Sequence, residues 1–257
     1  MGRTLAFVYG VVSYVVFLLT FLYAIGFVMN VFVPRSIDFG GPEAPFMTAL
    51  LINAALLGLF AVQHSGMARP GFKEWWTKFV PRPVERSTFV LLSSLALALL
   101  FWQWRPMPGV LWSVRNTAGR YALLALSAFG WLMVLLSTYV INHYDLFGLR
   151  QVYLNLRGRE YTQLPFKVSA FYKFVRHPLL LGFIIAFWAT PVMTVGHLVF
   201  AVATTAYMLI AIRLEERDLE SFHGEYAEYK RRVPMLIPLP GKKAAVTPEP
   251  AREESAV

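Results

Sequence analysis

R-H-P-L-L-L-G at residues 176–182 opens the segment that decides the fold of this chain. An apolar run follows at 179–212, then R-L-E-E-R-D-L-E at 213–220 and E-Y-A-E-Y-K-R-R-V-P-M-L-I-P at 225–238. Ionisable side chains therefore flank both ends of a stretch long enough to enter a lipid bilayer. Because charges at the rim of a bilayer are costly to order, this pairing indicates a polar ligand site beside lipid.

The apolar run at 179–212 is too long for one ordinary membrane helix of about 20 residues. Thr190, Pro191 and Gly196 lie in its middle. We expect a helical hairpin of two short helices, with the turn at residues 190–197. The alternative is one long, kinked helix. A hairpin would bring the two charged ends together at one membrane face.

The composition of the 257-residue chain indicates an integral membrane protein. Only 15% of the residues are charged and 57% are hydrophobic, whereas soluble domains carry about 25% charged residues. The net charge of +9 lies in the loops and the C-terminal region. This favours lipid contact over nucleic-acid binding. The absence of cysteine excludes disulfides and a cysteine nucleophile, and the scattered methionines predict no metal site.

Four further apolar runs precede the hairpin, at residues 5–33, 46–62, 88–102 and 121–141. The first exceeds the 7–15-residue apolar core of a signal peptide, so we expect a membrane helix there. Together the runs predict an all-α integral membrane protein. Its parts are four transmembrane helices, the C-terminal hairpin and a cytoplasmic C-terminal helix, which makes five to six membrane segments.

The same pattern predicts a single membrane-embedded domain over residues 1–240, followed by a disordered tail at 241–257. Basic residues concentrate in the segments 64–87 and 142–177 and after the hairpin. By the positive-inside rule these segments face the cytoplasm. The ends of the hairpin and the charged motifs would then share one membrane face.

Two features of the hairpin ends point to ligand binding. A helix at 213–220 would place Arg213 and Glu216 on one face, and Glu215 on another. Such a charge run is usually a solvated helix, but this one begins where the apolar run ends. His177 precedes Pro178, which stops an incoming helix and can open the next one. His177 is therefore expected at a helix N-terminus, where backbone N–H groups can accept a carboxylate.

These motifs resemble the isoprenylcysteine carboxyl methyltransferase superfamily of membrane-embedded methyltransferases. The matching positions are Arg176, His177, Pro178, Gly182, Arg213, Glu215, Glu216, Leu219, Tyr226, Tyr229, Val233, Pro234, Ile237 and Pro238. Two departures occur. Leu180 stands where the family usually has tyrosine, which puts one aromatic ligand contact in doubt. F-H-G-E-Y at 222–226 stands where the family has F-G-x-x-Y, so the glycine comes one residue later. This difference is expected to shift the loop that closes over the cofactor.

The resemblance implies S-adenosyl-L-methionine as the cofactor, held by a part of the domain at about 140–240. It assigns the cofactor-binding positions to Arg176, His177, Pro178, Gly182, Arg213, Glu215, Glu216, Tyr226 and Tyr229. We expect His177 and nearby N–H groups to hold the methionine carboxylate. Arg213 would orient the glutamate pair, with Glu216 on the ribose or amino group. Tyr226 and Tyr229 would line the adenine or close the tunnel.

A-V-Q-H-S-G-M-A-R at 61–69 and N-H-Y-D-L-F-G-L-R-Q at 142–151 resemble the nurim-like branch of this superfamily. The second motif is most similar to that of bacterial enzymes in the branch, which methylate a small volatile thiol, methanethiol, to dimethyl sulfide. The resemblance therefore implies a thiol S-methyltransferase in the bacterial inner membrane. Its partners would be the thiol and the bilayer, and its active site would face the cytoplasm.

Methyl transfer to a thiol requires a base or a local positive field, because the thiolate is the nucleophile. His64 and His143 are the candidate bases, and Arg150 and Arg176 are the candidate cations. Asp145 is a further candidate, with a helix cap as its alternative role. A lone histidine at a helix end is more often structural, and we expect that of His197.

Two other functions remain open at this level. One is methylation of a lipid-linked acceptor, such as an isoprenylcysteine carboxylate or a phospholipid amine, which would use the same cofactor motifs. The other is a non-catalytic nurim-like membrane protein, or a helper of nitrogen-oxide metabolism, that retains only the scaffold. The retained R-H-P and glutamate pair argue against the second.

Overall fold

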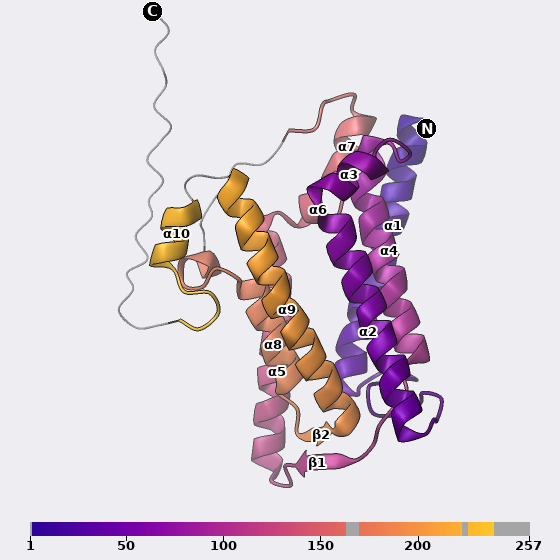
Figure 1. Cartoon of the computed structure of the whole chain (residues 1–257), viewed down its shortest axis with the longest axis vertical. Coiled ribbons are helices and arrows are strands. Elements are labelled where there is room, and N and C mark those ends of the chain that lie inside the picture. Colours follow the sequence, from indigo (N-terminus) through magenta and orange to yellow (C-terminus); the bar gives the residue numbers. More distant parts are fainter. Residues whose placement is uncertain (1, 163–169, 223–225, 239–257) are drawn as a thin grey trace, which may run out of the picture.

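The computed structural model describes residues 2–162, 170–222 and 226–238, which form a helical bundle with one small sheet (Figure 1). The tail at 241–257 and His223 and Gly224 of the shifted motif lie outside the described residues. The helices are α1 (Arg3–Met29), α2 (Phe46–Ala68), α3 (Pro70–Trp76), α4 (Arg82–Gln103), α5 (Thr117–Ile141), α6 (His143–Leu146), α7 (Leu149–Leu156), the 3₁₀ turn η1 (Ala170–Lys173), α8 (Pro178–Trp188), α9 (Val195–Phe222) and α10 (Tyr226–Arg232).

Five of these helices, α1, α2, α4, α5 and α9, are long and apolar enough to cross a membrane, and α8 is a shorter apolar helix. The prediction of an all-α membrane protein is therefore confirmed. The hairpin is also confirmed, since α8 and α9 are separate helices joined through residues 189–194. The charge run at 213–220 is the end of α9 itself, so the second hairpin helix continues further than expected.

Helix α8 packs against α5 through two glycines. A Cβ atom on Gly182 would lie 2.8 Å from the carbonyl oxygen of Gly130, and one on Gly130 would lie 2.6 Å from that of Gly182. Only glycine permits this approach of two backbones, as in other membrane helix pairs. Ser127 adds a hydrogen bond of 3.0 Å from its hydroxyl to the carbonyl of Ala186. This contact sets the position of α8 and of the charged motif that precedes it.

One end of the bundle is closed by a small sheet and by aromatic packing (Figure 1). Strand β1 (Val110–Ser113) pairs antiparallel with β2 (Val192–Thr194), which forms part of the hairpin turn. The buried Trp104 donates its indole N–H to the carbonyl of Ile37 at 3.0 Å. His197 is fully buried here, with Nε2 2.8 Å from the carbonyl oxygen of Phe187. This placement agrees with the structural role expected of His197.

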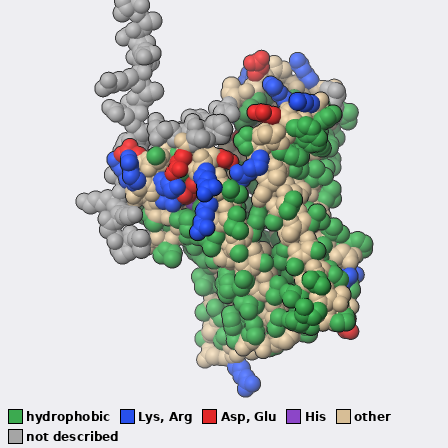
Figure 2. All heavy atoms as spheres, in the orientation of Figure 1, with side chains coloured by type: hydrophobic (Ala, Val, Ile, Leu, Met, Phe, Trp, Pro, Cys, Tyr) green, Lys and Arg blue, Asp and Glu red, His purple; other side chains and the backbone are tan. Residues whose placement is uncertain are grey.

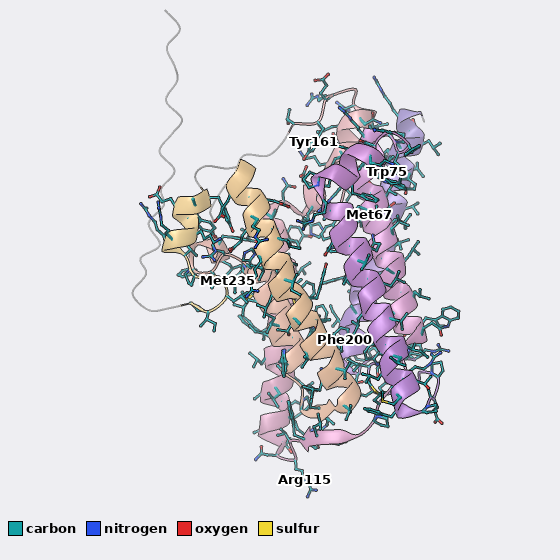
Figure 3. All side chains as sticks on the ribbon, in the orientation of Figure 1. Met67, Trp75, Arg115, Tyr161, Phe200 and Met235 are labelled. Carbon is teal, nitrogen blue, oxygen red and sulfur yellow. The ribbon has the colours of Figure 1, made fainter. Side chains whose placement is uncertain are left out.

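The opposite end of the bundle carries most of the charge. Hydrophobic side chains cover the visible middle of the molecule, whereas acidic and basic side chains gather around the ends of α9, α10 and α3 (Figure 2). Exposed leucines such as Leu19 on α1, Leu51 on α2 and Leu132 on α5 fit contact with lipid. Figure 3 shows Arg115 at the sheet end and Tyr161 at the charged end, with Phe200 between them.

Candidate active site

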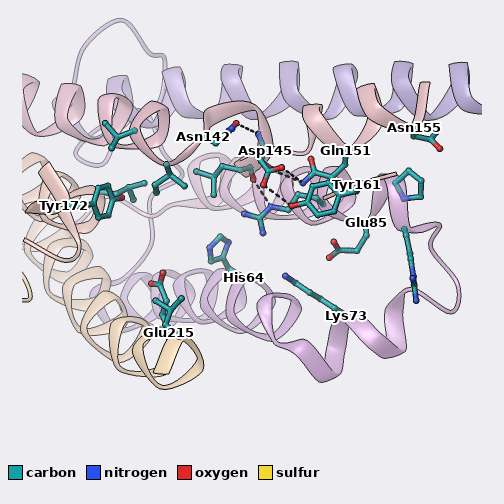
Figure 4. Close-up of a pocket in the computed structure, with 18 of the residues that line it drawn as sticks. His64, Lys73, Glu85, Asn142, Asp145, Gln151, Asn155, Tyr161, Tyr172 and Glu215 are labelled. Atoms are coloured by element: carbon teal, nitrogen blue, oxygen red, sulfur yellow. Dashed lines mark hydrogen bonds between the residues drawn. The ribbon is translucent and has the colours of Figure 1, made fainter. Parts of the chain in front are cut away.

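A cleft of about 1590 Å³ lies at the charged end of the bundle (Figure 4). It is lined by side chains from α2, α3, α4 and α5, from residues 142–161, and from η1, α8, α9 and α10. Typical pockets for small ligands measure about 300–1,000 Å³. The cleft is therefore large enough for a nucleoside-sized cofactor together with a small second ligand.

Glu216 is the centre of one wall, which we call the R-H-P wall: Arg176, His177, Glu215, Glu216 and Lys230. The Glu216 side chain is only 6% exposed and is surrounded by cations. Its Oε1 accepts a hydrogen bond of 2.7 Å from Arg176 Nε and lies 3.1 Å from His177 Nε2, while its Oε2 lies 3.2 Å from Lys230 Nζ. A buried carboxylate with these partners is held in its charged form and joins three separate segments of the chain.

Arg176 ties the end of the described chain to the start of α8. Its Nη1 donates to the carbonyls of Lys230, at 2.8 Å, and Val233. The backbone N–H groups of Arg176 and His177 donate to the carbonyls of Pro234 and Met235, at 2.9 and 3.2 Å. The V-P-x-x-I-P motif is thus the segment that docks on R-H-P, which explains why the two motifs occur together.

His177 and Pro178 begin α8 as the sequence predicts, with His177 as the N-terminal flanking residue and Pro178 in the first turn. The first intrahelical bond after the proline runs from the N–H of Leu181 to the carbonyl of His177. Leu179 and Leu180 precede that bond and line the cleft. Their N–H groups are therefore placed to meet an anionic ligand group.

Glu215, rather than Glu216, presents a carboxylate to the cleft. Its side chain is 56% exposed, lines the cleft and lies 3.8 Å from His177 Nδ1 (Figure 4). The ribose or amino contact expected of Glu216 therefore suits Glu215 better. Arg213 is exposed and, in the described residues, forms no ion pair with either glutamate. Arg176 and Lys230 orient Glu216 in its place.

Three tyrosines line the same end of the cleft: Tyr172 from η1, and Tyr226 and Tyr229 from α10. Tyr226 and Tyr229 are almost fully buried, and the Tyr229 hydroxyl donates to the carbonyl of Tyr172 at 2.7 Å. Burial raises the pKa of all three phenols, and the charge of Glu215 raises that of Tyr172 further. All three therefore stay neutral, and the partly exposed Tyr172 offers a flat ring to a ligand, backed by the buried pair Tyr226 and Tyr229. Gly182 and Pro178 do not line the cleft; they position α8.

The second wall, the His64 wall, comprises His64, Lys73, Arg86, Asp145 and Tyr161. His64 lies on α2 and points into the cleft (Figure 4). Its Nδ1 is 3.2 Å from the hydroxyl of Ser93, and its ring stacks on Phe60 with 5.1 Å between centroids. These contacts hold the ring and leave Nε2 on the side available to a ligand.

The motif at 142–151 forms a tight turn that places Asp145 on the cleft. Asn142 caps α6 by accepting the N–H of Asp145 at 3.0 Å, so the capping role considered for Asp145 belongs to Asn142. The carboxylate of Asp145 accepts hydrogen bonds from Arg150, at 3.0 Å, and from the Tyr161 hydroxyl, at 3.2 Å. Gly148 has φ +85° and approaches Ser87 so closely that a side chain would collide with α4.

Two predicted residues of this motif are turned away from the cleft. His143 is buried, its ring nitrogens lie 2.8 Å from the hydroxyls of Tyr14 and Thr138, and burial lowers its pKa. This placement argues against His143 as the base. The guanidinium of Arg150 donates hydrogen bonds to Asp145 and Thr162, and Arg150 does not line the cleft. This placement argues against a direct role of Arg150 in the positive field around the thiolate.

Sequence reasoning missed four cleft residues, namely Lys73, Arg86, Tyr161 and Tyr172, and also Lys230, which binds Glu216. Both Lys73 and Arg86 belong to the basic segment 64–87, from which the sequence predicts only the orientation in the membrane. A signal was nevertheless present, because Arg86 lies at the start of the candidate membrane helix α4, and ionisable residues within membrane segments usually have a function. In the described residues, no group of three or more His, Cys, Asp or Glu side chains is placed to hold a metal ion.

These features define a helical membrane protein with a polar ligand cleft at one end. A family model described as NnrU protein matches residues 51–237, and the chain belongs to this family. No solved structure matches the chain.

Relatives cover almost the whole chain. A methanethiol S-methyltransferase of Mycobacterium tuberculosis is 57% identical over 93% of this chain and 98% of its own length. A methanethiol S-methyltransferase of Crocosphaera subtropica is 56% identical over 95% of this chain and 96% of its own length. Nurim of Bos taurus is 27% identical over 76% of each chain. These relatives confirm the prediction of a methyltransferase and of the nurim-like branch.

Proposed function

We propose that this protein transfers a methyl group from S-adenosyl-L-methionine to a small thiol, methanethiol, and so forms dimethyl sulfide. The observation that carries the proposal is one cleft shared by the R-H-P wall and the His64 wall. The names of the relatives at 56–57% identity support the acceptor. The size of the cleft supports a cofactor and an acceptor bound at the same time.

The R-H-P wall fits S-adenosylmethionine in three respects. The N–H groups of Leu179 and Leu180 at the start of α8 suit the methionine carboxylate. The exposed carboxylate of Glu215 suits the ribose hydroxyls or the amino group. The rings of Tyr172 and Tyr226 suit the adenine. When bound, the cofactor supplies a methyl group already activated on a sulfonium.

The His64 wall would prepare the thiol. His64 Nε2 accepts the S–H proton, while Ser93 holds the ring through Nδ1. The electron pair of the S–H bond stays on sulfur and forms the new bond to the methyl carbon, and the proton leaves from His64 to water. Asp145, held by Arg150 and Tyr161, fixes the turn that shapes this end of the cleft.

The test is purified protein in lipid nanodiscs with methyl-labelled S-adenosylmethionine and methanethiol. We expect labelled dimethyl sulfide in the headspace. Label in extracted lipid would instead favour a lipid-linked acceptor, and absence of cofactor binding would favour a non-catalytic protein. The Lys78→Gln variant is the matched control, because Lys78 is exposed and lies outside the cleft.

We place the cleft on the cytoplasmic side of a bacterial inner membrane, because the basic segments surround it. The chain has no cysteine, so single cysteines report cleanly. Arg115→Cys, at the sheet end, should react with an impermeant maleimide in intact spheroplasts. Lys78→Cys should react only after permeabilisation, and the reverse pattern would overturn this orientation.

A further inference from the structure

The proposed thiol methylation requires a positive field that holds the thiolate, and no residue given a role so far supplies it. The two arginines chosen from sequence are already occupied. Arg150 binds Asp145, and Arg176 binds Glu216. An arginine paired with its own carboxylate contributes little net field to a ligand. The cation has to come from elsewhere in the cleft.

Arg86 is one such cation. It lies in the first turns of α4 and lines the cleft. Its Nε donates to the carbonyl of Leu146 at 2.7 Å, and its guanidinium lies 4.9 Å from the centroid of the Phe89 ring. These two contacts fix the side chain, and neither of them involves a carboxylate. Arginine held by a neutral carbonyl and an aromatic ring keeps its full charge for a ligand.

Lys73 is the second cation. It projects from α3 into the cleft, and in Figure 4 its ammonium end points toward His64. The structure gives Lys73 no ion pair within the described residues. Lys73 and Arg86 line the same cleft. Burial lowers the pKa of Lys73, and the charge of Arg86 lowers it further.

The other charges around this space do not cancel both cations. Glu85 faces Lys73 and raises its pKa. Asp145 faces Tyr161, but Arg150 is bound to its carboxylate. Arg86 also reaches Tyr161, where its charge lowers the phenol pKa that burial and Asp145 raise. Asp145 is offset by Arg150, which leaves the carboxylates of Glu85 and Glu160. The cations that line the cleft beside Lys73 and Arg86 include Arg3, Arg82 and Arg159, so the local balance is positive.

We propose that Lys73 and Arg86 are the thiolate-binding residues of the acceptor pocket, with His64 beside them as the base. This inference rests on the proposed function and supplies its acceptor site. The thiol S–H bond breaks, its proton goes to His64 Nε2, and the sulfur anion is held between the two cations. The sulfur then bonds to the methyl carbon, the carbon–sulfonium bond breaks, and its electron pair stays on the departing sulfur. Fixed cations in a cleft away from bulk water are strong stabilisers of such an anion.

The pocket would also set specificity. Lys73, Arg86 and His64 select a group that is a small anion after losing one proton, which describes an alkyl thiol and not a phospholipid amine. A neutral sulfide has no charge for the cations to hold. The product would therefore be released once the methyl group has been transferred.

The experiment compares Lys73→Gln, Arg86→Gln and Arg86→Lys with Lys78→Gln in the nanodisc assay. We expect kcat/KM for methanethiol to fall about 10²-fold in the two glutamine variants, as when one preorganised donor to an oxyanion is lost. S-adenosylmethionine affinity, measured separately, should stay within about twofold. Arg86→Lys should recover part of the loss, because it keeps the charge.

Two measurements distinguish thiolate binding by Lys73 and Arg86 from a purely structural role of these residues. The pH profile of kcat, which reports ionisations in the enzyme–substrate complex, should move to higher pH in the glutamine variants, because the bound thiol becomes harder to ionise. A larger but more acidic thiol, trifluoroethanethiol, should lose much less activity than methanethiol, when each variant is compared with wild-type protein acting on the same thiol. Lys73→Gln keeps this test valid if Arg86→Gln unfolds, because the Lys73 side chain forms no ion pair within the described part of the chain and glutamine keeps most of its length.

The inference is overturned if wild-type protein methylates methanethiol and both glutamine variants match Lys78→Gln. It is overturned equally if the two thiols lose activity to the same extent. Failure of the proposed function looks different, because wild-type protein would then bind S-adenosylmethionine without forming dimethyl sulfide.

Discussion

The two walls of the cleft use similar side chains in opposite ways. In the R-H-P wall, Glu216 is buried and binds Arg176, His177 and Lys230, so most of the charge is neutralised inside the protein. In the His64 wall, Lys73 and Arg86 line the cleft without a carboxylate bonded to them among the described residues. A charge that is already paired holds the fold, whereas an unpaired charge at a cleft is available to a ligand. Burial and partners, more than residue type, separate the two functions.

The sharpest test of this contrast is Glu216→Ala, for which we expect the largest effect. The change leaves Arg176, His177 and Lys230 around an empty site, and removing one partner of a buried pair costs about 3–5 kcal/mol. We expect a large drop in melting temperature and loss of S-adenosylmethionine binding, measured by thermal unfolding and by filter binding.

Glu228→Ala is the control for Glu216→Ala. Glu228 forms an exposed ion pair with Arg232 on α10, and such pairs contribute about 0–1 kcal/mol. If Glu216→Ala were as stable as Glu228→Ala, the structural role of Glu216 would be wrong.

His64→Gln tests the other wall and should affect the chemical step. We expect kcat for methanethiol to fall by about 10²–10³-fold, because a positioned base contributes an effect of that order. Stability and S-adenosylmethionine affinity should remain close to wild type, since His64 faces the cleft. Single-turnover kinetics at saturating cofactor measure the step, and an unchanged rate would remove His64 from the mechanism.

Glu215→Gln should have a smaller effect, confined to the cofactor. We expect S-adenosylmethionine affinity to fall by about 10–100-fold, because hydrogen bonds to a charged group are worth about 1.5–3 kcal/mol. The fold should persist, since the Glu215 side chain is 56% exposed. Isothermal titration measures the affinity. Binding as tight as wild type would show that Glu215 does not contact the cofactor.

The smallest effect on activity is expected for His143→Gln. His143 binds Tyr14 and Thr138 away from the cleft, so its loss should cost about 1–3 kcal/mol of stability through unpaired buried groups. The kcat/KM for methanethiol should stay within about twofold at a temperature where the variant is folded. A loss as large as that of His64→Gln would restore His143 as a candidate base.

The positions of particular residues show how much of the structure could be predicted from local sequence pattern. The hairpin at 179–212 and the position of His177 and Pro178 at the start of α8 follow from local rules of helix formation. The partners of Glu216 do not follow from such rules. Arg176 lies 40 residues before Glu216 and 54 residues before Lys230, so only chain packing brings the three together.

The histidines show the same limit. His64 and His143 both stand in polar motifs beside apolar runs, and no local feature separates them. In the structure the ring of His64 faces the cleft, whereas His143 faces α1 and stacks on Tyr139 with 4.4 Å between centroids. The direction of a side chain at a helix end depends on which helix packs beside it, and that information is not local.

The sequence by itself determined the membrane class, the helical hairpin and the family motifs, because hydrophobic length and helix-terminus chemistry depend on neighbouring residues. Only the tertiary structure decided which charges are paired. Glu216 is enclosed by residues from α10 and from the segment just before α8, while Glu215, its neighbour in the chain, faces the cleft. The physical reason is that the charge a ligand meets depends on burial and counter-ions, which exist only after distant segments have packed.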